Sequence, residues 1–227
     1  MITTCIFDAY GTLFDVAAAA RQAAAEPGHE DFAAHWPDIS ANWRQKQLQY
    51  SWLRTITGTH TDFWTLTQDG LDWALEAQGL QHDTALRDRL LALYWQLSAY
   101  EEVPATLAAL REAGLNTAIL SNGSPEMLSG AVQSAGIGEM LDAVLSVESV
   151  GMFKPAPQVY DMVIQRFGCA KNHVLFVSSN GWDAGAAAAY GFETVWVNRA
   201  GDPVDRLPGR PDHILPDLTA IPGLVAL

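Results

Sequence analysis

Polar clusters follow apolar runs at four places in this 227-residue sequence, and their residue types suit nucleophilic chemistry. The clusters are Asp8, Ser121-Asn122, Lys154 and the segment Ser178–Asp183. A carboxylate can act as a nucleophile and form a covalent intermediate, and a nearby ammonium group keeps it ionised. Hydroxyl and amide groups can hold the anionic part of a substrate. The pattern predicts a reactive site built around Asp8, although that stretch alone is equally consistent with a carboxylate that only starts a turn or caps a helix.

The elements that position these clusters alternate between strand and helix. A first strand runs through Ile6-Phe7, and further strands are predicted at Asn116–Leu120, Ala143–Val147, Val174–Val177 and Thr194–Val197. Helices are predicted between the strands at Ala105–Ala113, Pro125–Ala135, Pro157–Phe167 and Ala184–Tyr190. Such alternation is typical of a parallel sheet, whose strands end at a common crevice. We therefore expect the polar clusters to meet there.

A helical insertion separates the first strand from the rest of this pattern. Residues from about 14 to 100 contain no convincing strand, and helices are predicted at Val16–Glu26, Asn42–Leu53, Phe63–Ala77 and Leu86–Leu97. We predict an α/β fold with a Rossmann-like parallel-sheet core, residues 1–14 and 101–227, and a helical cap domain, residues 15–100, that covers the crevice.

Composition and charge argue against several classes of partner. Hydrophobic residues make up 49% of the chain, enough for a sizeable core, and the formal net charge is −13. This acidic balance argues against nucleic acid and anionic membranes as partners. The two cysteines, Cys5 and Cys169, fit no metal-binding spacing, and we expect Cys5 to be a buried thiol. Neither a signal-peptide pattern nor an apolar run of about 18 residues occurs, so we expect a cytoplasmic protein.

The segment Phe7–Leu13 resembles the nucleophile motif of the haloacid dehalogenase (HAD-like) hydrolase superfamily, whose general pattern is Asp-x-Asp-x-Thr. Asp8 and Thr12 match the first and last positions of that motif. In most members the second Asp is an acid and base whose backbone helps to hold magnesium, but this chain has Tyr10 there. The L-2-haloacid dehalogenases of type II carry such a tyrosine. The chain is similar to that subfamily, and the resemblance implies a hydrolase without metal or other cofactor.

Further motifs extend the resemblance over nearly the whole chain. Ser121 matches the anion-binding Ser or Thr of the superfamily, and Lys154 matches a lysine that orients the nucleophile. Tyr160 falls where the subfamily keeps a tyrosine. Ser178-Ser179 stand where metal-dependent phosphatases have Gly-Asp. The subfamily residues that position the lysine and the hydrolytic water are implied to be Ser178, Asn180 and Asp183.

The predicted cap contributes Arg44, at the place of an arginine that subfamily members lower onto the active site. A departing halide develops negative charge and is stabilised by a fixed cation and N–H donors away from water. The halogen pocket is implied to consist of Arg44, Asn122, Leu48, Phe63 and Trp182, while Ser121 and the backbone N–H groups of Ala9 and Tyr10 hold the substrate carboxylate. The implied reaction converts short L-2-haloalkanoic acids to D-2-hydroxy acids through an ester on Asp8, with inversion at C2.

Plainer interpretations and other functions stay open. Lys154 is consistent with a surface lysine, Tyr160 with packing, and Arg44 with the solvated face of an amphipathic helix. The alternative functions are a metal-dependent small-molecule phosphatase of the same superfamily and a non-catalytic HAD-like binding subunit. No Gly-x-Ser-x-Gly elbow, phosphate loop or dinucleotide fingerprint occurs in the sequence. Subfamily members are often homodimers, and the stripe Trp43–Trp52 is a candidate for part of the dimer surface.

Overall fold

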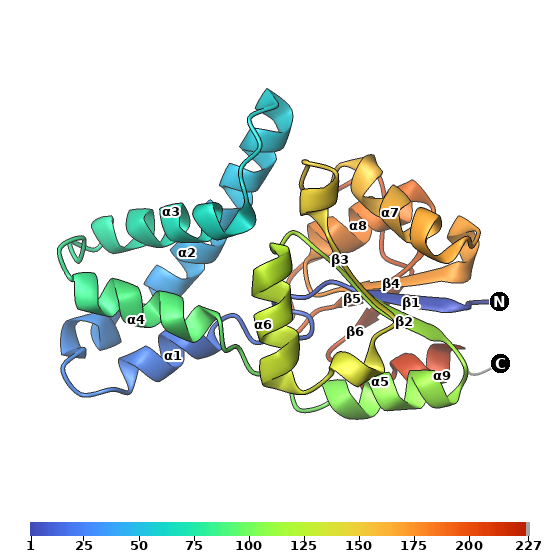
Figure 1. Ribbon diagram of the computed structural model, residues 1–227, viewed down its shortest axis with the longest axis horizontal. Coiled ribbons are helices and arrows are strands. Elements are labelled where there is room, and N and C mark those ends of the chain that lie inside the picture. The colour runs from blue at the N-terminus through green and yellow to red at the C-terminus, as the bar shows by residue number, and fades with distance from the viewer. Residues whose placement is uncertain (226–227) are drawn as a thin grey trace.

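Apolar runs form a six-stranded parallel sheet in the strand order β3-β2-β1-β4-β5-β6 (Figure 1). The structure is a computed structural model that describes residues 1–225. The strands are β1 Thr4–Phe7, β2 Asn116–Ser121, β3 Ala143–Ser146, β4 Val174–Ser178, β5 Glu193–Val197 and β6 His213–Leu215. Phe7, at the end of the central strand β1, pairs with Ile119 of β2 and Val177 of β4. Asp8 therefore emerges between the ends of both neighbouring strands.

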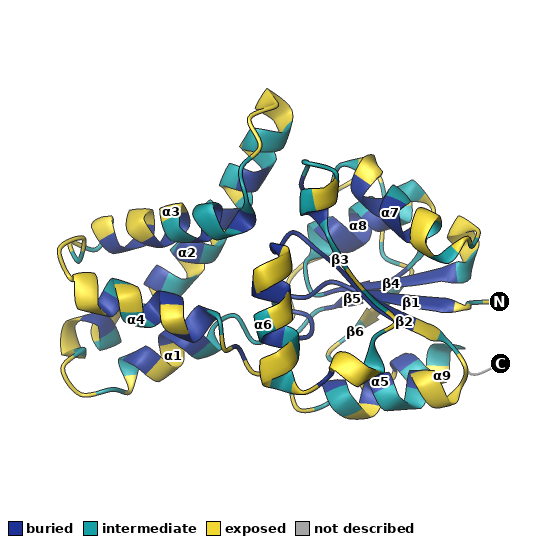
Figure 2. Cartoon of the chain, viewed as in Figure 1, coloured by how far each residue is buried: buried dark blue, intermediate teal, exposed yellow. Residues whose placement is uncertain are grey.

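Helices cover both faces of the sheet. Figure 1 shows α7 and α8 on one face and α5 and α9 on the other. The helices that follow the insertion are α5 Val103–Glu112, α6 Pro125–Ala135, α7 Pro157–Phe167, α8 Gly181–Tyr190 and α9 Ile221–Val225. Three single turns of 3₁₀ helix occur at Gly138–Met140, Val147–Ser149 and Lys171–His173. The strands between these layers are largely buried, whereas the outer faces of the helices are exposed (Figure 2).

The insertion after β1 is entirely helical and forms a lobe beside the sheet (Figure 1). Its helices are α1 Ala18–Ala24, α2 Glu30–Thr57, α3 Phe63–Glu76 and α4 Thr84–Tyr94. Asp62 and Asp83 cap α3 and α4, since their carboxylates accept hydrogen bonds from the amides of Thr65 and Leu86. The long helix α2 packs along α3 and reaches the sheet side of the lobe with its second half.

The predicted fold class is confirmed, but several predicted bounds differ from the structure and two elements were missed. Helix α2 begins at Glu30, not near residue 42, and contains Pro37. Phe32 and Ile39 are buried on either side of Pro37. Their packing keeps both halves of the helix in place although the proline cannot donate one backbone hydrogen bond. Helix α4 ends at Tyr94, three residues before the predicted Leu97. Strand β6 and helix α9 were not predicted.

The tryptophan stripe of α2 lies inside the molecule more than on its surface. Trp43 is 4% exposed, and its indole N–H donates to the carbonyl of Thr67 in α3. Trp52 stacks edge-to-face on Trp182 of α8, with ring centroids 5.3 Å apart. The expectation that the stripe Trp43–Trp52 contributes to a dimer surface is wrong for Trp43. Within residues 1–225, no helix combines the length and apolar character that membrane crossing requires.

Candidate active site

Asp8 lies at the end of β1 and is held on both carboxylate oxygens. Its Oδ1 accepts a hydrogen bond from Lys154 Nζ at 3.0 Å. Its Oδ2 accepts from the Thr12 hydroxyl at 3.0 Å and from Asn180 Nδ2 at 3.1 Å. Only 6% of the residue is exposed. Thr12 and Asn180 come from the two loops predicted to carry them. Together with Lys154 they fix the carboxylate in one orientation.

Lys154 bridges two carboxylates in the interior. Its Nζ lies 3.0 Å from Asp8 and 2.9 Å from Asp183 Oδ2, and the residue is 1% exposed, which rules out the interpretation as a surface lysine. Burial alone lowers the pKa of this ammonium group, but the carboxylates of Asp183 and Asp8 outweigh burial and raise the pKa above the ordinary lysine value. The group therefore stays cationic beside Asp8 at neutral pH.

Tyr160 and Asp183 support this bridge from behind. The Tyr160 hydroxyl donates to Asp183 Oδ1 at 2.7 Å, and burial together with Asp183 raises the pKa of the tyrosine well above its ordinary value. Burial also raises the pKa of the Asp183 carboxyl, although Lys154 counteracts part of that effect. The Asp183 carboxylate contacts Lys154 and Tyr160, so it acts on Asp8 through Lys154. Ser178 lies nearby, where its hydroxyl accepts from the amide of Asn180 at 3.1 Å.

A small cavity of about 10 Å³ lies between helices α2 and α3 and the strand ends of the sheet. A space of this size holds about one water molecule. Most of the residues predicted to bind substrate meet around it. Its lining comprises Asp8, Tyr10, Arg44, Leu48, Phe63, Ser121, Asn122, Lys154, Asn180 and Trp182. The predicted residues Ala9, Thr12, Tyr160, Ser178 and Asp183 lie outside this wall, the last four in the supporting contacts described above.

Arg44 of helix α2 lines the cavity with its guanidinium group. Its Nη2 donates to the Tyr10 backbone carbonyl at 3.2 Å and approaches Asn180 Oδ1 at 3.4 Å. Its Nη1 donates to Gln47 Oε1 at 2.9 Å. The guanidinium thus faces the strand ends, which excludes its interpretation as part of a solvated helix face. Asn122 also lines the cavity, and its Oδ1 accepts from the Lys154 amide at 2.9 Å, which leaves its Nδ2 donor for a ligand.

Gln47 is a functional candidate that the sequence reasoning missed. It is 1% exposed, and its Nε2 donates to the Thr67 hydroxyl at 2.7 Å and the Tyr94 hydroxyl at 3.2 Å. Because its Oε1 accepts from Arg44, this buried amide joins the arginine to α3 and α4. Its position three residues after Arg44 on a helix is the only signal in the sequence.

Donors for an anion gather beside Asp8. The described hydrogen bonds give no acceptor to the backbone amides of Ala9 and Tyr10. The Ser121 hydroxyl accepts from the Gly123 amide at 3.1 Å, which turns its own hydrogen away from that amide. Gly123 has to be glycine, since an added Cβ would lie 2.7 Å from the Tyr10 ring. These groups can bind a carboxylate next to the nucleophile.

The donor set does not fit a magnesium ion, which prefers near-octahedral oxygen ligands that include carboxylates. Lys154 lies between the carboxylates of Asp8 and Asp183. The guanidinium of Arg44 binds the Tyr10 carbonyl, the backbone position that helps to hold magnesium in most members of the superfamily. The chain's own cations therefore occupy the oxygens that a metal would need. Among the described residues, no group of three or more His, Cys, Asp or Glu side chains could hold a metal.

Comparison with known proteins gives the same family at the level of sequence and of structure. The sequence profile of the haloacid dehalogenase-like hydrolases matches residues 2–191. The chain is 45% identical over 224 residues to (S)-2-haloacid dehalogenase 1 of Pseudomonas sp. (strain CBS-3), covering 99% of this chain and 96% of that protein.

Two crystal structures share the whole architecture. One, described as a dehalogenase, superposes with a TM-score of 0.94 at 41% identity, covering 100% of this chain and 98% of its own. The other is the L-2-haloacid dehalogenase from Xanthobacter autotrophicus with chloropropionic acid covalently bound, with a TM-score of 0.85 at 38% identity over 99% and 98% of the two chains. With a family profile over most of its length and full-length relatives above 30% identity, this chain belongs to the haloacid dehalogenase-like hydrolase family.

Proposed function

We propose that this protein is an (S)-2-haloacid dehalogenase, which hydrolyses short L-2-haloalkanoic acids to D-2-hydroxy acids. The observation that carries the proposal is that Asp8, whose carboxylate is fixed on both oxygens, and Arg44 line the same small cavity. A fixed carboxylate and a cation around one small ligand suit a nucleophile and an acceptor for the leaving group. The relatives at 38–45% identity that carry the name (S)-2-haloacid dehalogenase support the same reaction.

In the first step, Asp8 attacks C2 and the carbon–halogen bond breaks. The halide leaves with the bonding electrons toward Arg44 and the free Nδ2 of Asn122, while Leu48, Phe63 and Trp182 exclude water. Ser121 and the amides of Ala9 and Tyr10 hold the substrate carboxylate. Lys154 and Thr12 hold Asp8 in one orientation until the ester forms.

In the second step, water attacks the carboxyl carbon of the Asp8 ester. Asn180, whose amide contacts Asp8, orients this water. Asp183 orients the water together with Asn180, and Lys154, Tyr160 and Ser178 hold these groups in place. One proton of the water passes to the departing alkoxide, and the other leaves to solvent. Cleavage of the ester restores Asp8 and releases the D-2-hydroxy acid. Splitting one difficult displacement into two steps is the advantage of covalent catalysis.

Halide release from separate enantiomers of 2-chloropropionate, after EDTA treatment and gel filtration, tests this function. We expect L-2-chloropropionate alone to be consumed, D-lactate to be the product, and activity to be unchanged by metal removal. Use of both enantiomers or retention at C2 would contradict the proposal. A loss of activity that magnesium restores, with phosphate-ester hydrolysis, would favour the phosphatase; no turnover of either substrate class would favour the binding subunit.

We propose further that residues 15–100 act as a cap domain over a core of residues 1–14 and 101–227, and that the protein is a cytoplasmic homodimer. The exposed side chains Leu53 and Trp73, on the neighbouring helices α2 and α3, support a second copy docking on the cap. Light scattering during gel filtration tests the dimer, and a monomeric mass at micromolar concentration would contradict it. Both cysteines are free thiols, as expected in a reducing compartment.

A further inference from the structure

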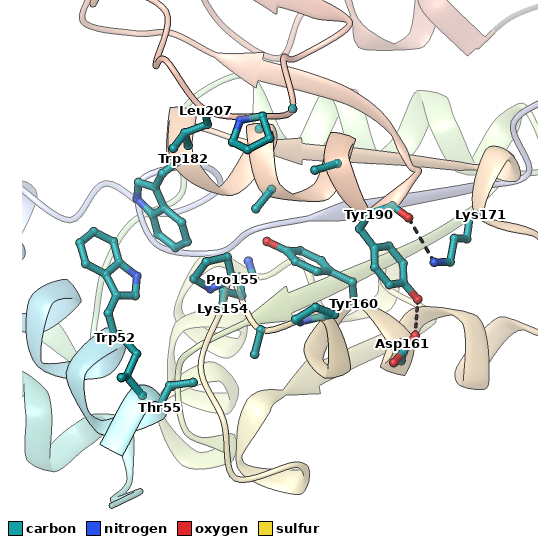
Figure 3. A pocket seen from close by; sticks show the side chains of 18 residues that line it. Trp52, Thr55, Lys154, Pro155, Tyr160, Asp161, Lys171, Trp182, Tyr190 and Leu207 are labelled. Carbon is teal, nitrogen blue, oxygen red and sulfur yellow. Dashed lines mark hydrogen bonds between the residues drawn. The ribbon is translucent and has the colours of Figure 1, made fainter. Parts of the chain in front are cut away.

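An apolar groove of about 970 Å³ lies outside the catalytic cavity, between the end of α2 and helices α7 and α8 (Figure 3). The cap supplies Trp52 and Ile56 to its wall, and the core supplies Ala186 and Leu207. Lys171 and Asp161 line the groove as well, and each hydrogen-bonds to Tyr190. The rest of the wall outside the catalytic cavity is mainly apolar.

This groove and the catalytic cavity share two wall residues, Lys154 and Trp182. The cavity holds about one water molecule, and Asp8 and Ser121 are 6% and 1% exposed. A space for one water holds no 2-haloalkanoic acid, so the walls have to move apart for substrate to enter, and a longer chain needs still more room. Because Lys154 and Trp182 border both spaces, the groove is the neighbouring volume into which such a molecule can extend.

Trp52 and Trp182 meet at the boundary between the two spaces. Figure 3 shows Trp52 on the cap side facing Trp182 on the core side, and their rings stack edge-to-face. Both indole N–H groups are buried, and neither has a hydrogen-bond partner among residues 1–225. Only packing holds the two rings together. They can separate without breaking a hydrogen bond. Separating Arg44 from the core, by contrast, would break its hydrogen bonds to Tyr10 and Asn180.

We propose that Trp52 and Trp182 form a gate and that the groove binds the alkyl tail of longer 2-haloalkanoic acids. The carboxylate and C2 of such a substrate occupy the catalytic cavity, and carbons beyond C3 pass along Lys154 and between the two rings. The mainly apolar wall suits a hydrocarbon chain. This inference rests on the proposed function and extends it to the substrate class, making the groove a determinant of chain length.

A chain-length series tests the groove. The probes are the (S)-enantiomers of 2-bromopropionate, 2-bromohexanoate and 2-bromooctanoate, and the variant is Ala186→Phe, which fills the groove from α8. Each buried methylene contributes up to about fourfold in kcat/KM. We expect Ala186→Phe to lower kcat/KM for 2-bromooctanoate at least tenfold while the value for 2-bromopropionate stays within about twofold of the parent.

Two further variants make the result decisive. Leu207→Glu places a charge in the groove from a side chain that is 42% exposed, so it tests the proposal even if Ala186→Phe does not fold. Ala105→Phe is the matched control, since Ala105 lies exposed on α5 across the sheet. Three results would contradict the proposed role of the groove: equal losses for short and long substrates, no loss for either, or no turnover of 2-bromooctanoate by the parent. Failure of the parent on 2-bromopropionate would instead reject the proposed function.

Discussion

The sheet half of the site and the cap half are built differently. On the sheet side, Asp8, Lys154 and Asp183 are buried, and each makes at least two charge-assisted or hydroxyl hydrogen bonds. On the cap side, Arg44 is half-buried and is anchored within the cap through one side chain, Gln47. Its contacts with the core are a carbonyl and an amide oxygen at 3.2 and 3.4 Å.

This contrast separates the two tasks of the reaction. The nucleophile needs one fixed orientation, and a closed network of ion pairs and hydrogen bonds provides it. In the proposed mechanism the halide is received by Arg44, which belongs to the helical insertion and has fewer and longer links to the core. We expect damage to the sheet half to affect folding and chemistry together, and damage to the cap half to affect chemistry alone.

Lys154→Met should have the largest effect. It leaves Asp8 and Asp183 buried side by side without their shared cation, which destabilises a protein by about 3–5 kcal/mol and costs ~10²–10³ in kcat. Urea unfolding and halide release measure the two losses. Lys46→Met on α2 is the control, because that lysine contacts only Gln49 and aromatic rings. A Lys154→Met protein as stable as the parent would remove the distinction between the two halves.

Arg44→Ala should leave folding nearly unchanged and lower kcat by ~10²–10³. The loss should be greater for 2-chloropropionate than for 2-bromopropionate, because chloride is the poorer leaving group and depends more on the fixed cation. The control is Arg54→Ala on the same helix, whose guanidinium contacts the Thr59 carbonyl far from the cavity. Equal losses for both halogens would show that Arg44 does not face the leaving group.

Gln47→Leu should have a smaller effect of about tenfold in kcat, the equivalent of one hydrogen bond to a charged group. If Gln47 acts by positioning Arg44, the loss should follow the same halogen order and disappear when Arg44 is already alanine. Gln49→Leu, on the exposed side of the same helix, should be neutral. A tenfold loss that persists in the Arg44→Ala background would assign Gln47 a purely structural role.

Local signals explain which parts of the fold could be predicted. The predicted bounds of α6 and α7 coincide with the structure, because each helix opens with a proline in its first turn and ends at a glycine with positive φ. Strand β6 has three residues after a segment rich in proline and glycine, and it forms through pairing with β5. No local pattern marks so short an edge strand.

The site residues show the same difference between local sequence signals and tertiary contacts. Asp8, Lys154 and Asn180 follow strands or lie in recognisable motifs, so topology alone brings them together. Gln47 and Trp52 stand on a helix whose apolar residues follow no single stripe, and their partners lie up to 130 residues away in Tyr94 and Trp182. Their importance comes from tertiary contacts, which no spacing in the sequence expresses.

The origin of the hydroxyl oxygen in the product tests the central claim, that Asp8 is a nucleophile and not a base for water. Asp8→Ala removes activity in either case, so isotope labelling has to decide. A single turnover of L-2-chloropropionate in H₂¹⁸O with excess protein, followed by mass spectrometry of lactate and of the peptide containing Asp8, gives the answer. The covalent mechanism predicts unlabelled D-lactate and one ¹⁸O retained in Asp8, because water attacks the carboxyl carbon of the ester. Labelled lactate together with unlabelled Asp8 would contradict it.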